Sequence, residues 1–254
     1  MLTRPVYFPY LPKQRSVRQQ VELAFPRRGV YRQDTFGIRT KFPFGFLEKT
    51  RKVDSNIEIA VYPRVEPTEE FYEILPLISG EMESFYRGRG HDLYSIRDYQ
   101  PTDSARFVDW KASAKTSALK VREFTREDER RVMLVFDPFW SAKMAAQPEE
   151  QFERAVNLCA CLAWHFYEID SEVQFRMPGF ETPMATAGEI IYDVLRMLAF
   201  VEPAAATDSG AEEKFLRELV GEPDLFKIIF TSQPRGSIPT SLWTSSYIVF
   251  FQSL

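Results

Sequence analysis

The half of the chain from Arg131 onward alternates between short apolar runs and longer amphipathic runs. Strands are predicted at 132–136, 173–177, 225–230 and 247–251, and helices at about 149–167, 188–200 and 212–220. This alternation is typical of a doubly wound, mainly parallel sheet with helices on both faces. In such sheets, binding sites lie beyond the carboxyl ends of the strands. The sequence therefore predicts an α/β domain over residues 129–254, with its site at that edge of the sheet.

The first 66 residues have a different pattern. Short runs rich in β-branched and aromatic residues, such as 21–25 and 57–62, are separated by the turn signals Pro26–Gly29 and Phe42–Gly45. We interpret residues 1–66 as a small antiparallel β domain. The aromatics of the second turn are expected to close that domain rather than to bind a partner.

Residues 67–128 connect the two domains and are predicted to hold a helical linker followed by a charged segment. Acidic and apolar residues alternate from Glu66 to about Arg87, which favours an amphipathic helix broken near Pro76. The period of two in 119–124 predicts a strand.

The segment Arg87–Glu127 mixes both signs of charge with aromatics at irregular spacing, unlike ordinary core. Arginine forks and carboxylates here could form an inward-facing lattice of ion pairs and hydrogen bonds. The candidate residues are Arg97, Asp98, Tyr99, Asp103, Arg106, Asp109, Trp110 and Lys111.

The order and spacing of this segment resemble the signature of the domain of unknown function 58 family. The matching positions are Gly88, Gly90, Arg97-Asp98-Tyr99, Asp103, Arg106, Asp109-Trp110, Ser113-Ala114-Lys115 and Val121-Arg122-Glu123-Phe124. The resemblance implies a β region followed by a von Willebrand factor A-like domain, bacterial or archaeal origin, and work alongside MoxR-type AAA+ ATPases. Members often carry two membrane helices ahead of the matched region, so it also implies membrane proximity if such helices precede Met1 in the native chain.

The loop after the first strand of the α/β domain bears on metal binding. In von Willebrand factor A domains, an Asp-x-Ser-x-Ser loop often holds a divalent cation there, together with Thr and Asp from other loops. Here the loop reads Asp137-Pro138-Phe139-Trp140-Ser141, and Thr231-Ser232-Gln233 stands where an acid is common. Because Mg²⁺ needs several oxygen ligands, we expect no metal or other cofactor. Asp137 is instead expected to accept backbone N–H bonds.

Two other function classes can be weighed on the same residues. A hydrolase would use His91 with Asp92 as its catalytic pair, because the other histidine, His165, lies in an apolar helical run. The sequence contains no nucleophile elbow, phosphate-binding Gly loop or Cys–His pair to accompany His91 and Asp92. Asp103 and Asp109 have basic neighbours that favour their charged forms, so they suit structural acceptors better than proton donors. Nucleic-acid binding is disfavoured because acids are interleaved with the basic and aromatic groups.

The cysteines, the charges and the apolar runs of the chain indicate where in the cell it is expected. Cys159 and Cys161 lie two positions apart in an apolar helical run, where they point apart and behave as small hydrophobes. The first sixty residues hold twelve Lys or Arg against five acids, whereas 132–254 hold eight against seventeen. No apolar run approaches the roughly 20 residues that span a bilayer. We expect a cytoplasmic chain, with the inner face of the membrane as the alternative location.

The function predicted from these observations is a non-catalytic protein-interaction module, an adaptor or scaffold working with a MoxR-type AAA+ ATPase in protein assembly or maturation. Its docking face is predicted to combine the exposed signature with the end of the sheet, where Phe139 and Trp140 replace a metal bridge by apolar contact. The residues are Arg97, Tyr99, Asp103, Arg106, Asp109, Trp110, Asp137, Phe139, Trp140 and Ser141. Equally, both aromatics could pack under the signature segment. The main alternative is a metal-dependent adhesion-type module in which a cation at Asp137 and Ser141 binds a partner's carboxylate.

Overall fold

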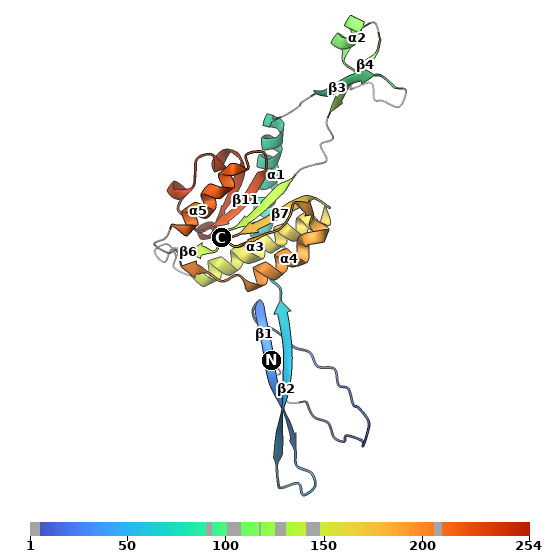
Figure 1. Ribbon diagram of the computed structural model, residues 1–254, viewed down its shortest axis with the longest axis vertical. Coiled ribbons are helices and arrows are strands. Elements are labelled where there is room, and N and C mark those ends of the chain that lie inside the picture. Colours follow the sequence, from blue (N-terminus) through green and yellow to red (C-terminus); the bar gives the residue numbers. More distant parts are fainter. Residues whose placement is uncertain are drawn as a thin grey trace. The chain divides into compact units, whose positions relative to one another are not determined.

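The computed structural model describes residues 6–89, 93–100, 108–116, 118–124, 131–140, 148–205 and 210–254 (Figure 1). The chain divides into two compact units. One unit comprises Met1–Pro63 with Leu195–Val201, and the other comprises Arg64–Val194 with Glu202–Leu254. The second unit contains the larger sheet and the site described below.

The first unit is built around one long hairpin. Strand β1 (Gly29–Thr40) pairs antiparallel with β2 (Lys49–Val61), and the register shifts between Gln33 and Thr35. The predicted antiparallel β structure is therefore present, and the Phe-Pro-Phe-Gly turn connects its two strands. The aromatics of this turn were expected to close the domain, but Phe42, Phe44 and Phe46 are all exposed, so that expectation is wrong. At the start of β1, the Tyr31 hydroxyl donates to the carbonyl of Arg27 (2.9 Å) and its ring packs on Phe25 (4.7 Å).

The run 21–25 was predicted as a strand, and this prediction is wrong because the run belongs to no strand. Residues 21–24 are all exposed, so neither face of the run is covered at these positions. A strand without a paired neighbour leaves its N–H and C=O groups to water, and β propensity alone does not compensate for that.

The larger sheet in the second unit has the order β12-β11-β5-β7-β8. Strands β5 (Val132–Phe136), β7 (Glu172–Met177), β11 (Phe226–Thr231) and β12 (Ser246–Phe250) run parallel. Two short strands, β8 (Phe180–Glu181) and β9 (Ala185–Thr186), pair antiparallel with β7. The predicted mainly parallel sheet is confirmed, with each of its four strands within one residue of the predicted bounds.

Helices cover both faces of this sheet, as its strand pattern requires. Met133 and Val135 of β5 pack in a cluster with Phe215 of α5 (Ala211–Glu218). The other face carries Phe136, whose ring meets Phe152 of α3 (Pro148–Glu168) at 5.6 Å. All of β5 is buried. The remaining elements are α4 (Ala187–Phe200), β6 (Phe139–Trp140), β10 (Ala204–Ala205), η2 (Leu219–Gly221), η3 (Arg235–Ser237), η4 (Leu242–Thr244) and η5 (Phe251–Ser253).

Helix α1 (Glu69–Arg89) continues through Pro76, so the predicted break at that residue is wrong. Proline removes one backbone donor, which deprives the carbonyl of Tyr72 of its helical partner. Tyr72 is exposed, so water can reach this end of the helix. Phe71 and Ile78 are buried on either side of the proline, and this packing holds the helix together.

The signature segment contains β3 (Leu93–Asp98), α2 (Trp110–Thr116) and β4 (Lys120–Phe124). Strands β3 and β4 pair antiparallel, with a register shift between Leu93 and Ser95. Strand β4, at the end of the segment, was predicted. Strand β3 was not, because the charged and aromatic residues of β3 do not alternate regularly with apolar ones. Across the helices that the structure describes, none is both long and apolar enough to cross a membrane.

Candidate functional site

The centre of the sheet's carboxyl edge is closed by a buried hydrogen bond. The chain leaves β5 toward β7 on one side and returns to β11 on the other, so the topological switch point lies between β5 and β11. Asp137 follows β5 and Thr231 ends β11, and the Thr231 hydroxyl donates to Oδ2 of Asp137 at 2.7 Å. Both residues are fully buried. The usual ligand crevice of such a sheet is thus filled here by the protein's own side chains.

Three further hydrogen bonds extend this network. Oδ1 of Asp137 accepts from the N–H of Phe139 (3.1 Å), which confirms the predicted role of Asp137 as an acceptor of backbone N–H bonds. The Thr231 hydroxyl oxygen also accepts from the N–H of Gln233 (3.0 Å), and the Ser232 hydroxyl donates to the carbonyl of Phe139 (2.7 Å). The loops after β5 and β11 are therefore tied together.

The two aromatics of the β5 loop have different environments. Trp140 is only 8% exposed and stacks on Phe251 with ring centroids 5.8 Å apart. Phe139 is half-buried, packs against the Met133–Val135 cluster and also lines a cleft. Strand β6, which holds both residues, pairs in parallel with β10. Trp140 is thus a core residue, and Phe139 is the aromatic that reaches an accessible site.

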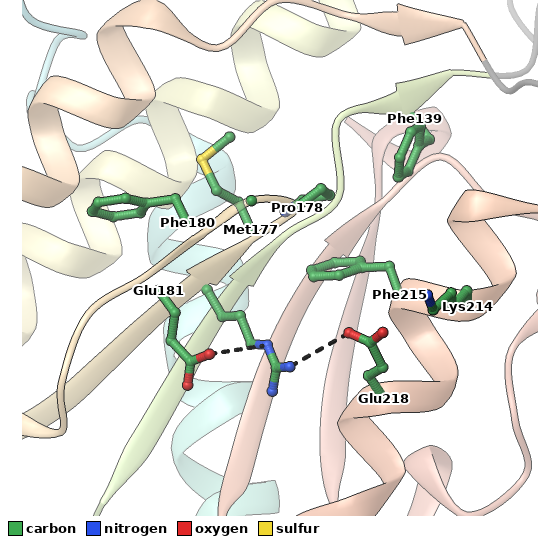
Figure 2. Close-up of a pocket in the computed structure, with 10 residues that line it drawn as sticks. Phe139, Met177, Pro178, Phe180, Glu181, Lys214, Phe215 and Glu218 are labelled. Carbon is green, nitrogen blue, oxygen red and sulfur yellow. Dashed lines mark ion pairs between the residues drawn. The ribbon is translucent and has the colours of Figure 1, made fainter.

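The cleft has a volume of about 420 Å³ and lies beyond the carboxyl end of β7 (Figure 2). Its apolar side chains come from three places: Phe139 after β5, the β7–β8 turn, and Phe215 on α5. The turn carries Gly179 at φ +77°, a conformation that glycine adopts without strain. This turn folds the chain back so that Met177 pairs with Phe180. The other lining residues are Arg176, Pro178, Gly179, Glu181, Lys214 and Glu218.

Arg176 forms the polar wall of the cleft. Its guanidinium lies 3.1 Å from Glu222, 3.6 Å from Glu181 and 3.6 Å from Glu218. Its ion pairs with Glu181 on β8 and Glu218 on α5 place it between two elements, and both carboxylates are labelled in Figure 2. Its side chain is 17% exposed, so its guanidinium is surrounded mostly by protein atoms rather than by water. The arginine therefore links the β7–β8 hairpin to α5 and fixes the width of the cleft.

The donor set around Asp137 does not fit a divalent cation. Both carboxylate oxygens of Asp137 accept hydrogen bonds from the protein, and Phe139 brings carbon where an oxygen ligand is needed. In the described part of the chain, no group of three or more His, Cys, Asp or Glu residues is arranged to hold a metal ion. Ser141 lies outside the described residues.

Within the signature, Asp109 has a clear structural role. Its Oδ1 accepts from the N–H groups of Lys111 (3.0 Å) and Ala112 (2.9 Å), so it caps the N-terminus of α2. Its own N–H donates to the carbonyl of Lys120 (2.8 Å), which anchors the cap to β4. The next residue, Trp110, is 70% exposed.

The other predicted signature residues are described only in part. The Tyr99 N–H donates to the carbonyl of Leu119 (2.9 Å), and Lys120 pairs with Asp98 at 2.7 Å. Arg97 lies on β3, and its side chain is outside the described part. Asp103 and Arg106 are also outside the described residues, as are His91 and Asp92 of the hydrolase hypothesis.

The remaining chemically active groups have structural environments. His165 is half-buried with its ring 6.0 Å from Phe71. Cys159 and Cys161 are free and buried, as predicted. Burial, together with the charge of Glu66, raises the pKa of Cys161 to about 11, and burial also raises the pKa of Cys159. Protonated thiols of this kind are poor nucleophiles at neutral pH.

Sequence reasoning located the edge of the site but missed the cleft residues Arg176, Met177, Phe180 and Phe215. These come from two segments about forty residues apart, and no local pattern joins them. One usable signal was present: Pro178-Gly179 follows a predicted strand directly, which indicates a tight return beside the strand's carboxyl end.

The structure therefore defines an α/β protein with a mainly parallel sheet, a separate two-stranded hairpin and a half-apolar cleft at the sheet's carboxyl edge. The chain belongs to the family described as "Protein of unknown function DUF58", whose pattern matches residues 95–221. That range includes most of the signature, the first parallel strands and the cleft-lining helix α5.

A curated relative extends the similarity beyond that range. The chain is 26% identical over 230 residues to "Uncharacterized protein YeaD" of Bacillus subtilis (strain 168), an alignment that covers 86% of this chain and 53% of the relative. The chain thus spans about half the length of that protein. No solved structure matches significantly.

Proposed function

We propose that this chain is a non-catalytic protein-interaction module that docks a partner protein at the carboxyl edge of its sheet. The observation that carries the proposal is the cleft in which Phe139 lies beside Phe215 and the β7–β8 turn (Figure 2). An apolar floor with a charged rim is the usual form of a protein-binding hot spot. A volume of about 420 Å³ suits one or two side chains of a partner.

The chemistry of the cleft supports binding rather than turnover. Its two lining carboxylates, Glu181 and Glu218, both pair with Arg176, so each is already engaged in an ion pair within the protein. Among the described residues that line it, none is His, Cys or Ser. Histidine is the commonest general acid or base and Ser and Cys are common nucleophiles, so the described lining offers only Lys214 and two ion-paired carboxylates for such roles.

We further infer a von Willebrand factor A-like fold for the second unit and a MoxR-type AAA+ ATPase as the partner, with the chain acting as adaptor or scaffold. The fold is supported by the central position of β5, the helices on both faces and the acidic residue directly after β5. The ATPase partnership rests on what membership of the family implies. Trp110 is a second contact point, since a large exposed aromatic on a capped helix suits an interface anchor.

The test is a direct binding measurement between the purified chain and the MoxR-type ATPase of the same organism, by biolayer interferometry with and without ATP. Phe139→Ala removes the apolar floor, and Lys214→Glu reverses an exposed charge at the rim. Tyr72→Ala removes an exposed aromatic on α1 outside the cleft and is the matched control. Because anchor residues carry much of the binding energy, each cleft variant should bind about tenfold more weakly or worse.

Binding that is equal in wild type and in both cleft variants would place the interface elsewhere, and Trp110→Ala then tests the signature. Absence of binding by the folded wild type would remove the ATPase from the proposal. Thermal unfolding of each variant ensures that a loss of binding is not a loss of fold, since Phe139 also contacts the core.

A further inference from the structure

A second surface, outside the proposed docking cleft, lies at the tip of the β1–β2 hairpin. The six residues Phe42–Leu47 connect the strands and contain three phenylalanines and a leucine but no charge. The side chains of Phe42, Phe44, Phe46 and Leu47 are between 59% and 85% exposed. Exposure of this size on four large apolar residues within one six-residue turn marks an interaction surface rather than an ordinary turn.

Local hydrogen bonds give the tip a defined shape. The Gly45 N–H donates to the carbonyl of Lys41 (2.7 Å), and the Phe42 N–H donates to the Thr40 hydroxyl (3.1 Å). Gly45 has φ +72°, which a larger residue would adopt only with strain. The rings of Phe44 and Phe46 lie 5.9 Å apart. The aromatics are thus held together as one apolar patch.

Cations lie on the strands directly behind this patch. Between Phe36 and Val53 the chain holds five cations and one acid, a net charge of +4. The cations are Arg39, Lys41, Lys49, Arg51 and Lys52. The acid, Glu48, pairs with Arg39 at 2.9 Å. Since a strand rises about 3.3 Å per residue, all of these cations lie within about 17 Å of the tip.

The order of these groups along the hairpin matches the depth profile of a lipid interface. Apolar rings occupy the end, and ammonium and guanidinium groups follow at the level where phosphates would lie. Single-stranded nucleic acid would need cations among the aromatics, whereas the tip has six uncharged residues in succession. Each cation near an anionic lipid surface strengthens the electrostatic attraction, and each ring buried among the acyl chains adds a favourable free energy of transfer from water.

We propose that the β1–β2 hairpin tip inserts into the surface of an anionic lipid bilayer, with Phe42, Phe44, Phe46 and Leu47 among the acyl chains and the strand cations at the phosphates. This inference goes beyond the proposed docking function and is independent of it. It concerns reversible binding at the surface and involves no helix that crosses the bilayer.

The test is co-sedimentation of the full chain with vesicles of phosphatidylcholine alone or mixed equally with phosphatidylglycerol. The tip variant is Phe44→Ser/Phe46→Ser, and the charge variant is Lys41→Gln/Lys49→Gln. The control, Tyr10→Ser/Tyr72→Ser, removes two exposed aromatics outside the hairpin. We expect wild type and control to bind mixed vesicles, the tip variant to bind at least about tenfold more weakly, and the charge variant to lose the preference for anionic lipid.

Insertion is measured separately with Phe44→Trp and lipids brominated on their acyl chains, which quench an inserted indole. Quenching beyond that of wild type with the same vesicles supports the proposal. It is overturned if wild type does not bind mixed vesicles, or if the tip variant binds them as wild type does. Tip-dependent binding of a single-stranded oligonucleotide without vesicle binding also overturns it, as does a tip-dependent dimer in sedimentation velocity that fails to bind vesicles.

Discussion

The Thr231 hydroxyl lies 2.7 Å from Oδ2 of Asp137, and this hydrogen bond joins the two strands between which a sheet of this topology usually binds its ligand. The same hydroxyl oxygen accepts from the N–H of Gln233. Because all three residues are buried, the bond stabilises the centre of the sheet's edge and leaves the neighbouring cleft at β7 as the accessible site.

Thr231→Val should destabilise the second unit by about 2 kcal/mol, because valine keeps the shape but leaves a buried carboxylate oxygen and the Gln233 N–H without this partner. Chemical denaturation followed by tryptophan fluorescence measures the loss. Thr240→Val, at an exposed position, is the control and should change stability by less than about 0.5 kcal/mol. Equal stability of the Thr231 variant and wild type would mean that water or another group replaces the hydroxyl.

Divalent cations should not stabilise the protein. A bound ligand raises the unfolding midpoint by mass action, whereas the oxygens of Asp137 already accept protein donors and Phe139 supplies none. Thermal unfolding and calorimetric titration with Mg²⁺ and Mn²⁺ check this. Stabilisation that is present in wild type and lost in Asp137→Asn would revive the metal-dependent alternative.

Asp109→Ala should weaken α2 by about 1 kcal/mol, since the N–H groups of Lys111 and Ala112 lose their capping acceptor. Hydrogen exchange at these two amides should then be about fivefold faster. Asp109→Asn keeps an acceptor and should retain most of the protection. A binding defect in Asp109→Asn with normal exchange would instead indicate that the carboxylate contacts a partner.

The central parallel strands β5 and β11 could be predicted because each is buried on both faces and appears as a largely apolar run, whereas β7 was visible from its alternation of apolar and polar residues. Val132–Phe136 is an example, with five buried residues that match the predicted bounds. The break at Pro76 could not be decided from sequence. Whether a proline ends a helix depends on the packing of the neighbouring turns, and that is a property of the tertiary structure.

The candidate site was predictable only where it follows a strand directly. Asp137 and Phe139 come immediately after an apolar run, so the rule for carboxyl ends located them. Trp140 was assigned to the docking face, but in the structure it is buried against Phe251. Neighbouring side chains of a strand point to opposite faces, so in β6 one of the two aromatic rings points into the core. The partners of Arg176 lie on β8, α5 and the loop after η2, and their convergence depends on the fold.

Arg176→Met should cost about 1–2 kcal/mol, more than an ordinary surface pair, because the guanidinium is mostly buried and three glutamates lose their counter-charge. Arg217→Met breaks an exposed pair with Glu213 and is the control, with an expected loss below about 0.5 kcal/mol. The destabilisation by Arg176→Met should persist in high salt, since buried charge pairs are screened less than exposed ones. A loss no larger than that of the control would mean that the network contributes no more than a surface pair.

Alkaline pH should destabilise the fold through the two buried thiols. Burial raises the pKa of Cys159 and raises that of Cys161 to about 11, from 9.0 for an unperturbed thiol. A raised folded-state pKa means that the folded state holds the proton more tightly, so this contribution is intact below pH 9 and is lost as pH rises from there toward 11. Each thiol should contribute a slope of at most about 1.4 kcal/mol per pH unit in that window. Cys159→Ala/Cys161→Ala should therefore lose less stability than wild type between pH 9 and pH 10.5, whereas parallel curves for the two proteins would show that the thiols do not titrate with unfolding.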